Sequence, residues 1–208
     1  MINIPTFYSD FTALQRGDPD YRSTTSDVKK LILDLKNNNV SGIVIDLRNN
    51  SGGSLRESYE LAGLFIESGP VVQIRSSGGR ISLRGDRDDD IFWTGPMAVL
   101  VDRLSASASE IFAGAIQDYG RGLIIGDDTF GKGTVQQLIP IVDGQLKVTI
   151  AKFYRISGES TQNRGIIPDI KFPSILDHNE IGENALPTAL PYDQIRALKY
   201  PRYGNPSE

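Results

Sequence analysis

The chain of 208 residues contains no cysteine and a single histidine. Without cysteine it can form no disulfide framework, thiolate zinc site or iron–sulfur cluster, and it cannot be a cysteine protease. The one histidine, His178, lies in a polar stretch near the end of the chain, where we expect a solvated loop side chain. A hydrolase built from this sequence must therefore use a base other than histidine.

The sequence also lacks long apolar runs and clusters of basic residues. No apolar run of about 18 residues occurs, so we expect no stable membrane insertion. The first residues show no basic segment followed by an apolar one, as a signal peptide would. The formal net charge is −4 and the basic residues are scattered, which argues against nucleic acid as a partner. With 39% hydrophobic and 23% charged residues, the composition is that of an ordinary globular protein.

Buried strands and helices are expected to alternate through the middle of the chain. Three apolar, mostly β-branched runs are typical of strands buried on both faces. These runs are residues 42–47, 97–102 and 122–126. Apolar residues recur at helical spacing in segments between or before them. The expected helices are residues 25–38, 55–66 and 107–119. The alternation predicts an α/β fold whose mostly parallel, buried strands are covered by helices.

Further strands flank two turn signals. Residues 70–75 and 80–84 are expected to pair around a Ser-Ser-Gly-Gly turn. Residues 135–141 and 146–156 are expected to form a β-hairpin around Asp143-Gly144. The predicted fold is therefore a parallel core plus a hairpin.

Composition suggests one boundary near the end of the chain. Residues 176–208 are polar and contain prolines, so we expect short local structure at most. We find no internal repeat, and no linker long enough to divide the remainder. The sequence therefore predicts one core over 1–175 and a C-terminal extension over 176–208.

The segment Ser105-Ala-Ser-Ala-Ser-Glu110 follows a buried strand and leads into a helix. Ser107 is expected at the helix start, where free backbone N–H groups and the positive end of the helix dipole favour an oxyanion beside the serine. In the plainer interpretation, Ser105 or Ser107 caps the helix and Glu110 completes a capping box. The segment alone leaves both interpretations open.

Lys132 lies between two glycines in Gly131-Lys-Gly-Thr-Val-Gln136. A lysine is a general base only when neutral, so its pKa must fall from about 10.4 to roughly 7, which burial against apolar walls can achieve. One alternative is a solvated lysine in a turn. Another is a phosphate-binding loop, because Gly126-x-x-x-x-Gly131-Lys132 is close to a Walker A motif. Gly133 replaces the Ser or Thr that would hold magnesium, however, and strand-like residues follow.

The segment Asp46-Leu-Arg-Asn-Asn-Ser-Gly52-Gly53 follows the first buried strand. Its paired glycines expose backbone N–H groups at the carboxyl edge of the sheet, where open α/β sheets bind ligands. A plain strand-to-helix turn is an equal alternative. The acidic run at 85–90 lacks the ligand spacing of a calcium loop, so we expect a solvated turn there.

Together, and in this order, the three segments resemble the carboxyl-terminal processing (tail-specific) proteases, a serine peptidase family with a crotonase-like, ClpP-like core. The resemblance begins at Ile4-Pro-Thr-Phe-Tyr8, continues to Gly165-Ile-Ile-Pro-Asp-Ile170, and includes the spacing between serine and lysine. It implies that Ser107 is the nucleophile and that Lys132 is its base.

The resemblance also implies roles for other residues. Gln136 would orient the lysine, and the oxyanion donors would be the amide of Ala108 and one amide of the Gly52-Gly53 turn. Asp118 matches a position linked with activity in relatives, although we expect a structural role for it.

The implied activity is that of a serine endopeptidase that cleaves unfolded or C-terminally tagged polypeptides by acyl transfer. The substrate would lie extended along a sheet edge, and no metal or organic cofactor is implied. The alternative is a non-catalytic peptide- or ligand-binding module on the same fold.

Two further expectations rest on the resemblance alone. Family members usually carry a PDZ domain before this core, and this chain has no room for one, so we expect that domain elsewhere in a full-length protein. The implied location is the periplasm or another exported compartment.

Overall fold

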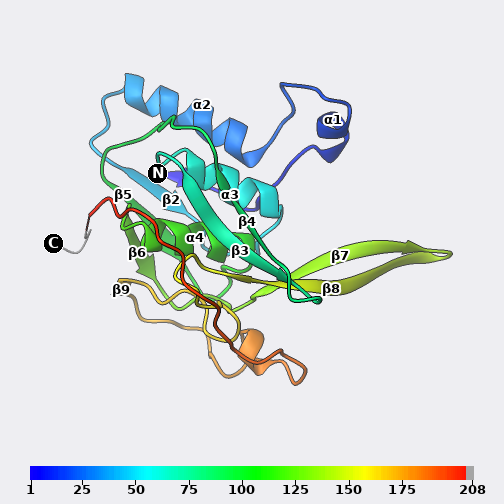
Figure 1. Ribbon diagram of the computed structural model, residues 1–208. Coiled ribbons are helices and arrows are strands. Elements are labelled where there is room, and N and C mark those ends of the chain that lie inside the picture. The colour runs from blue at the N-terminus through cyan, green and yellow to red at the C-terminus, as the bar shows by residue number, and fades with distance from the viewer. Residues whose placement is uncertain (205–208) are drawn as a thin grey trace.

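The computed structural model describes residues 1–204 and contains two sheets with helices packed on them (Figure 1). The first sheet is parallel throughout and has the order β1-β2-β5-β6-β9. Its strands are β1 (Ile2–Asn3), β2 (Ile43–Asp46), β5 (Met97–Val101), β6 (Leu123–Gly126) and β9 (Ile170–Lys171). Parallel neighbours require crossover connections, and the two in the middle of this sheet contain helices.

The helical segments of the described residues are α1 (Phe11–Gln15), α2 (Thr24–Asn37), α3 (Leu55–Gly63), α4 (Ala108–Asp118) and the 3-10 turn η1 (Glu183–Ala185). α2 begins where the Ser23 hydroxyl accepts a hydrogen bond from the Ser26 amide at 3.2 Å. Its buried apolar residues, Val28 and Ile32, are four positions apart and so share one face. α3 lies on the connection from β2 to β5, and α4 on the connection from β5 to β6.

The second sheet is antiparallel and has the order β4-β3-β8-β7. Its strands are β3 (Gly69–Ser76), β4 (Ile81–Asp86), β7 (Thr134–Ile141) and β8 (Gly144–Tyr154). The outer part of the β7–β8 hairpin, residues 136–150, projects beyond the rest of the molecule (Figure 1). We call residues 136–150 the arm.

α4 is the central helix of the fold. Every residue from Ala108 to Ile116 is buried, and the helix packs against α3, β3 and β6. The ring of Phe112 meets Phe65 edge-on at 5.9 Å between centroids and lies 6.4 Å from Phe7. Burial of each such aromatic side chain contributes about 1.5–3 kcal/mol to folding. α4 is therefore anchored in the core along its length.

Up to residue 204, the C-terminal extension packs along the core and has no regular structure beyond η1. The rings of Tyr200 and Tyr203 lie 5.4 and 6.1 Å from that of Tyr119, at the end of α4. The buried Arg103 donates from its side chain to the carbonyl oxygen of Ile181 at 2.6 Å. The extension therefore covers part of the core surface.

The predicted α/β class, with mostly parallel buried strands covered by helices and an added hairpin, is confirmed. The expected helix over 55–66 ends earlier, at Gly63, and the hairpin turn is Val142–Asp143. α1, β9 and η1 were not expected, because each has at most five residues and shows no hydrophobic period. Within residues 1–204, no helix has the length and apolar character needed to cross a membrane.

Candidate active site

Ser107 occupies the N-cap of α4 with a φ of 57°. A positive φ is uncommon for a residue with a Cβ atom, and costs about 1–3 kcal/mol. The residues on either side, Ala106 and Ala108, are buried, whereas Ser107 is partly exposed. The strained turn therefore presents the Ser107 hydroxyl to solvent.

The two neighbouring serines of the motif are structural in this fold. Ser105 is fully buried and its hydroxyl donates to the carbonyl oxygen of Leu47 at 2.8 Å. Ser109 is also fully buried and donates to the carbonyl oxygen of Asn50 at 2.8 Å. The two hydroxyls tie α4 and the segment before it to the loop after β2, so Ser107 alone of the three serines has an accessible hydroxyl.

The loop after β2 approaches Ser107 closely because Gly52 has no side chain. A Cβ atom on Gly52 would lie 2.9 Å from the Ser107 Cβ and 2.9 Å from the Ala106 oxygen. The amide of Gly52 already donates to the Asn50 side chain at 2.9 Å. Within residues 1–204, by contrast, the amides of Gly53 and Ala108 have no hydrogen-bond acceptor. These two amides are the free donors next to the serine.

Lys132 lies in the loop between β6 and β7, and its Nζ donates to Gln136 Oε1 at 3.1 Å. Its pKa is lowered, chiefly by burial and then by the charge of Lys147, against the opposing effect of Glu183 and Glu110. Both causes favour the neutral amine that a general base requires.

A cavity of about 340 Å³ brings the predicted residues together. Ser107, Lys132, Gln136, Gly53 and Ala108 all line it. Its apolar walls are Leu55, Ile111, Val135 and Phe153. Within the described residues, no hydrogen bond joins the Ser107 hydroxyl to Lys132 Nζ. Serine and lysine therefore share one cavity, lined on one side by apolar groups.

Glu110 connects the serine segment to the lysine segment. The side chain is fully buried and accepts four hydrogen bonds. The donors are the amides of Ser107 at 2.7 Å, Gly131 at 2.7 Å and Lys132 at 3.0 Å, and the hydroxyl of Thr129 at 2.6 Å. Burial raises the pKa of the Glu110 carboxyl to about 7 despite these donors.

The sequence alone gave Glu110 only a capping role. The bond to the Ser107 amide fits that interpretation, since an acid three residues after the N-cap is the capping-box signature. The bonds to the loop around Lys132 join residues 19 to 22 positions apart. No local pattern signals contacts at that separation.

Asp118 lies at the other end of α4 from Ser107 and does not line the cavity. It is buried and forms an ion pair with Arg155, whose Nε donates to it at 3.2 Å. Burial raises the pKa of Asp118, and Arg155 opposes that change. The contact joins α4 to the residue after β8, which fits the structural role expected for Asp118.

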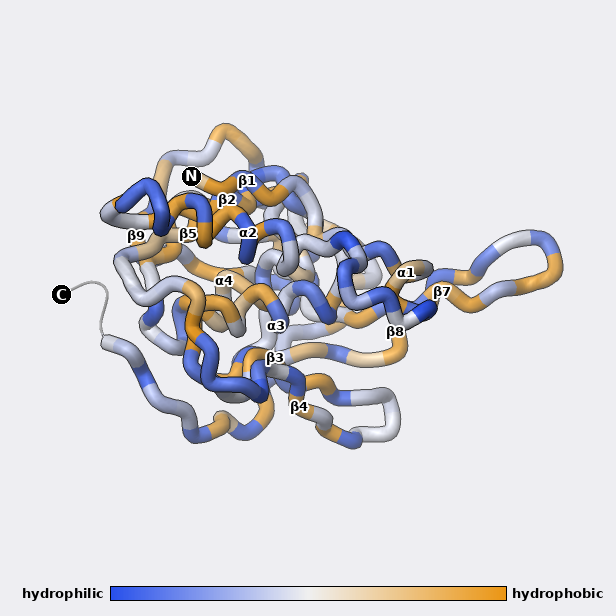
Figure 2. Tube along the Cα trace, turned by 90° about the horizontal axis from the view of Figure 1, so that it is seen from above, coloured by the Kyte–Doolittle hydropathy of each residue, from blue (hydrophilic) through white to orange (hydrophobic). Residues whose placement is uncertain are grey.

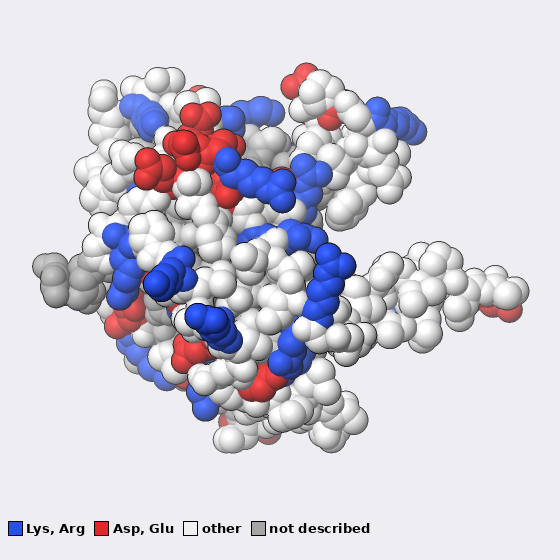
Figure 3. Space-filling model, in the orientation of Figure 1, with Lys and Arg blue, Asp and Glu red and all other residues white. Residues whose placement is uncertain are grey.

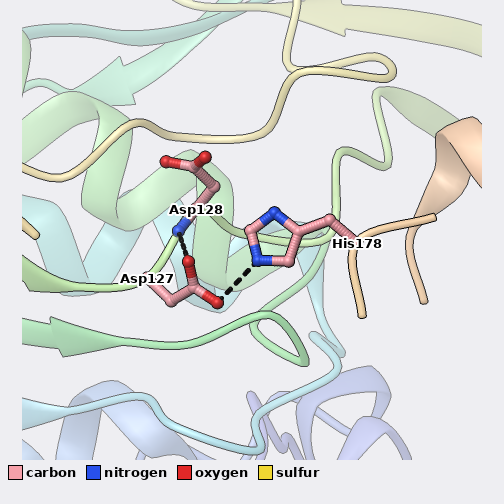
Figure 4. Close-up of side chains that lie close together, drawn as sticks. All are labelled: Asp127, Asp128 and His178. Atoms are coloured by element: carbon pink, nitrogen blue, oxygen red, sulfur yellow. Dashed lines mark hydrogen bonds and ion pairs between the residues drawn. The ribbon is translucent and has the colours of Figure 1, made fainter. Parts of the chain in front are cut away.

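His178 is not the solvated side chain that we expected. Its Nε2 lies 2.8 Å from Oδ2 of the buried Asp127, and the imidazole is 34% exposed (Figure 4). A polar sequence context could not show that a buried carboxylate 51 residues away would pair with the ring. The contact fixes the C-terminal extension to the loop that leads to Lys132.

The same place holds the one group of residues in the described chain with metal-ligand geometry. Ligand atoms of Asp127, Asp128 and His178 lie within 4.8 Å of one another (Figure 4). Lys171 Nζ already contacts Asp128 at 2.7 Å, and His178 Nε2 already contacts Asp127. Both carboxylates therefore have partners within the protein, so the geometry gives no reason to assign an ion.

Comparison with known proteins places the chain in a family. Residues 1–172 match the model of peptidase family S41. The chain is 46% identical to a tail-specific protease of Haemophilus influenzae over 214 aligned positions, which are 99% of this chain and 29% of that protein. It is 40% identical to a carboxy-terminal-processing protease of Bartonella bacilliformis over 153 positions, which are 71% of this chain and 35% of that protein.

A solved structure agrees with these sequence matches. The photosystem II D1 C-terminal processing protease superposes with a TM-score of 0.68 at 32% identity, over 85% of this chain and 43% of that one. The chain thus spans about a third of the curated relatives that it matches. The family match covers most of the chain and the fold agrees with it, so the chain belongs to peptidase family S41.

Proposed function

We propose that this chain is the catalytic core of a serine endopeptidase that cleaves polypeptides by acyl transfer, with Ser107 as nucleophile and Lys132 as general base. The observation that carries the proposal is the shared cavity, in which a strained, accessible serine faces a lysine of lowered pKa. A module that only binds peptides would need neither feature.

Each step can be assigned to an atom of this site. Neutral Lys132 takes the proton of the Ser107 hydroxyl as Oγ attacks the substrate carbonyl carbon. The oxyanion receives hydrogen bonds from the amides of Ala108 and Gly53. The Lys132 ammonium then protonates the leaving amine, and a water molecule hydrolyses the acyl-enzyme by the same path. The Ser107 hydroxyl and Lys132 Nζ are not hydrogen-bonded to each other in this unliganded site. Catalytic hydrogen bonds are often long without substrate and tighten when substrate binds.

Gln136 and Glu110 would hold the two reacting groups. Gln136 accepts a hydrogen bond from Lys132 Nζ and thereby limits its rotation. Glu110 bonds the backbone amides of both Ser107 and Lys132, so that one buried carboxyl sets their separation. Of the two glycines after β2, Gly53 is the proposed oxyanion donor, because the amide of Gly52 is bonded to Asn50.

The substrate class follows from the relatives rather than from the cavity. Proteins described as tail-specific or carboxy-terminal-processing proteases are 40–46% identical to this chain. We therefore propose unfolded or C-terminally tagged polypeptides as substrates, and a periplasmic or otherwise exported location. A PDZ domain in another part of the full-length protein would select the tail.

Labelling with a serine-reactive fluorophosphonate tests the proposal directly. We expect the full-length protein to be labelled at Ser107, and the Ser107→Ala and Lys132→Ala variants to lose labelling and peptide cleavage together. The matched control is Ser109→Ala, which removes a nearby hydroxyl that is buried and bonded to Asn50. A Ser107→Ala variant that still cleaved peptides would refute the assignment, and a wild-type protein that bound peptides without labelling or cleavage would support the binding-module alternative.

A further inference from the structure

β7 is an edge strand whose outer side is free. In the order β4-β3-β8-β7 it has a neighbour on one side only, within the described residues. The two-residue turn makes Ile141 and Gly144 the closing pair of the hairpin. In such a hairpin the closing pair is hydrogen-bonded, and the N–H and C=O groups of successive residues then point alternately toward and away from the partner strand. Gln136 and Leu138 therefore direct these groups away from β8, to the free edge.

This edge carries little of the usual protection, since its one register irregularity lies at the inner end, between Val135 and Gln136. Natural sheets blunt exposed edges with charged side chains, proline, bulges or a covering segment. β7 contains no charged residue. Its one proline, Pro140, stands at the outer end, where it removes the next outward-facing N–H group. The edge is therefore open at Gln136 and Leu138 and closed beyond them.

The arm also exposes aliphatic side chains on both faces. The exposed large aliphatic residues are Leu138, Ile139, Ile141, Val142, Leu146 and Ile150. Figure 2 shows hydrophobic residues along the arm, and Figure 3 shows it nearly free of charged side chains. A contiguous apolar surface of this kind marks a place where a soluble protein meets a partner.

The open edge is continuous with the candidate active site. Thr134, Val135 and Gln136, the first residues of β7, line the cavity that holds Ser107 and Lys132. A strand added along β7 would therefore run from the arm into this cavity. A surface used only to bury another folded part of the molecule has no need to end at the nucleophile.

We propose that the free edge of β7, at Gln136 and Leu138, is the docking strand for the polypeptide substrate, which adds an extended, apolar segment as a fifth strand of this sheet. This inference rests on the proposed peptidase function. Backbone pairing recognises any unfolded chain, whereas a folded protein has no free strand to offer. The apolar arm then favours substrate segments with hydrophobic side chains.

The hairpin register tells which side chains the substrate would meet. Gln136 and Leu138 pair with Thr149 and Lys147, and these residues share the face that continues into the cavity. Ile139 pairs with Leu146 on the opposite, apolar face. Successive substrate side chains would alternate between the two faces, so we expect the preference for apolar residues to recur at every second position.

The test is Leu138→Pro in the full-length protein, with Leu138→Ala as its matched control. Proline at position 138 removes an outward-facing N–H group and no hydrogen bond to β8. The natural Pro140 already does the same two residues further along the strand. Loss of one backbone bond should lower kcat/KM for a long unfolded polypeptide about tenfold, mainly through KM. The alanine variant keeps the N–H group and loses only side-chain contacts, so its kcat/KM should fall by less than about threefold.

A second measurement leaves the enzyme unchanged. Peptide substrates N-methylated at single positions should lose kcat/KM at alternate positions on one side of the scissile bond, because only every second amide pairs with the edge. A uniform loss, or none, would overturn the proposal even if Leu138→Pro failed to fold.

The remaining outcomes distinguish a failure of the docking proposal from a failure of the proposed peptidase function. Equal kinetics for Leu138→Pro and wild type, or equal losses in the proline and alanine variants, would show that the edge does not pair with substrate. A change of sedimentation in Leu138→Pro without a change in KM would assign the edge to a second copy. Absence of fluorophosphonate labelling in the wild type would instead refute the peptidase function itself.

Discussion

The elements that follow Ser107 and Lys132 differ in how much protein surrounds them. The serine stands at the start of a helix that is buried for nine consecutive residues, Ala108 to Ile116. The lysine precedes a strand whose residues are exposed on both faces from Gln136 outward. Buried segments open only with much of the fold, whereas exposed arms open at little cost in free energy. The helix after the proposed nucleophile is thus the fixed element, and the outer part of the strand after the proposed base is the adjustable one.

The sharpest test of this contrast is at Ser107 itself. Ser107→Ala should lower kcat/KM by several orders of magnitude, because serine and base act as one unit. Ser107→Gly should be as inactive yet more stable, since glycine adopts a φ of 57° without strain. Thermal unfolding and peptide hydrolysis on the same preparations measure both effects. A melting temperature lower than that of Ser107→Ala would contradict the strain at this position.

Glu110→Gln should have the next largest effect. Each carboxylate oxygen of Glu110 accepts two hydrogen bonds. Glutamine replaces one of these oxygens by an NH₂ group, which cannot accept, so two of the four bonds are lost. We expect at least a tenfold decrease in kcat, with little change in KM, and about 1–3 kcal/mol lower free energy of unfolding. The exposed Glu67→Gln is the control. A variant that lost stability but kept kcat would show that Glu110 does not position the reacting groups.

The pH dependence of kcat/KM tests the lysine side. The proposed base, Lys132, would act when neutral, and its pKa is lowered, so activity should rise with pH through an apparent pKa below that of free lysine. Lys147→Ala removes a positive charge that lowers this pKa, and should move the rise to higher pH, whereas Lys147→Arg should not. Because Lys147 is exposed, we expect a displacement of less than about one pH unit. A profile with no rise between pH 6 and 10 would count against Lys132 as the base.

Truncation of two isoleucines compares α4 with the arm through the free energy of unfolding, and we expect the smallest effect at the arm position. Ile116 in α4 is fully buried and Ile141 at the end of β7 is 56% exposed. Ile116→Ala should lower the free energy of unfolding by about 2–5 kcal/mol, and Ile141→Ala by about 0.5 kcal/mol or less. Chemical denaturation of both variants gives the comparison. Similar losses at the two positions would mean that the arm is part of the core in solution.

The sequence predicted those parts of the site that depend on neighbours along the chain. A buried strand, small residues and a helical period place Ser107 at a helix start, and the glycines around Lys132 predict an irregular loop. The choice of Gly53 over Gly52 as the proposed oxyanion donor could not be made from the sequence, because it depends on where the Asn50 side chain points. The role of Glu110 was hidden for the same reason, since three of its donors come from another loop.

The single histidine of these 208 residues gives the isolated chain a spectroscopic label that needs no engineering. His178 belongs to the C-terminal extension and contacts Asp127, five residues before Lys132. In a proton NMR spectrum the ring resonances of one imidazole are assigned without mutagenesis, and they follow its environment. Their chemical shift would report whether the extension stays docked while substrate or inhibitor occupies the cavity, in the unmodified protein and in real time.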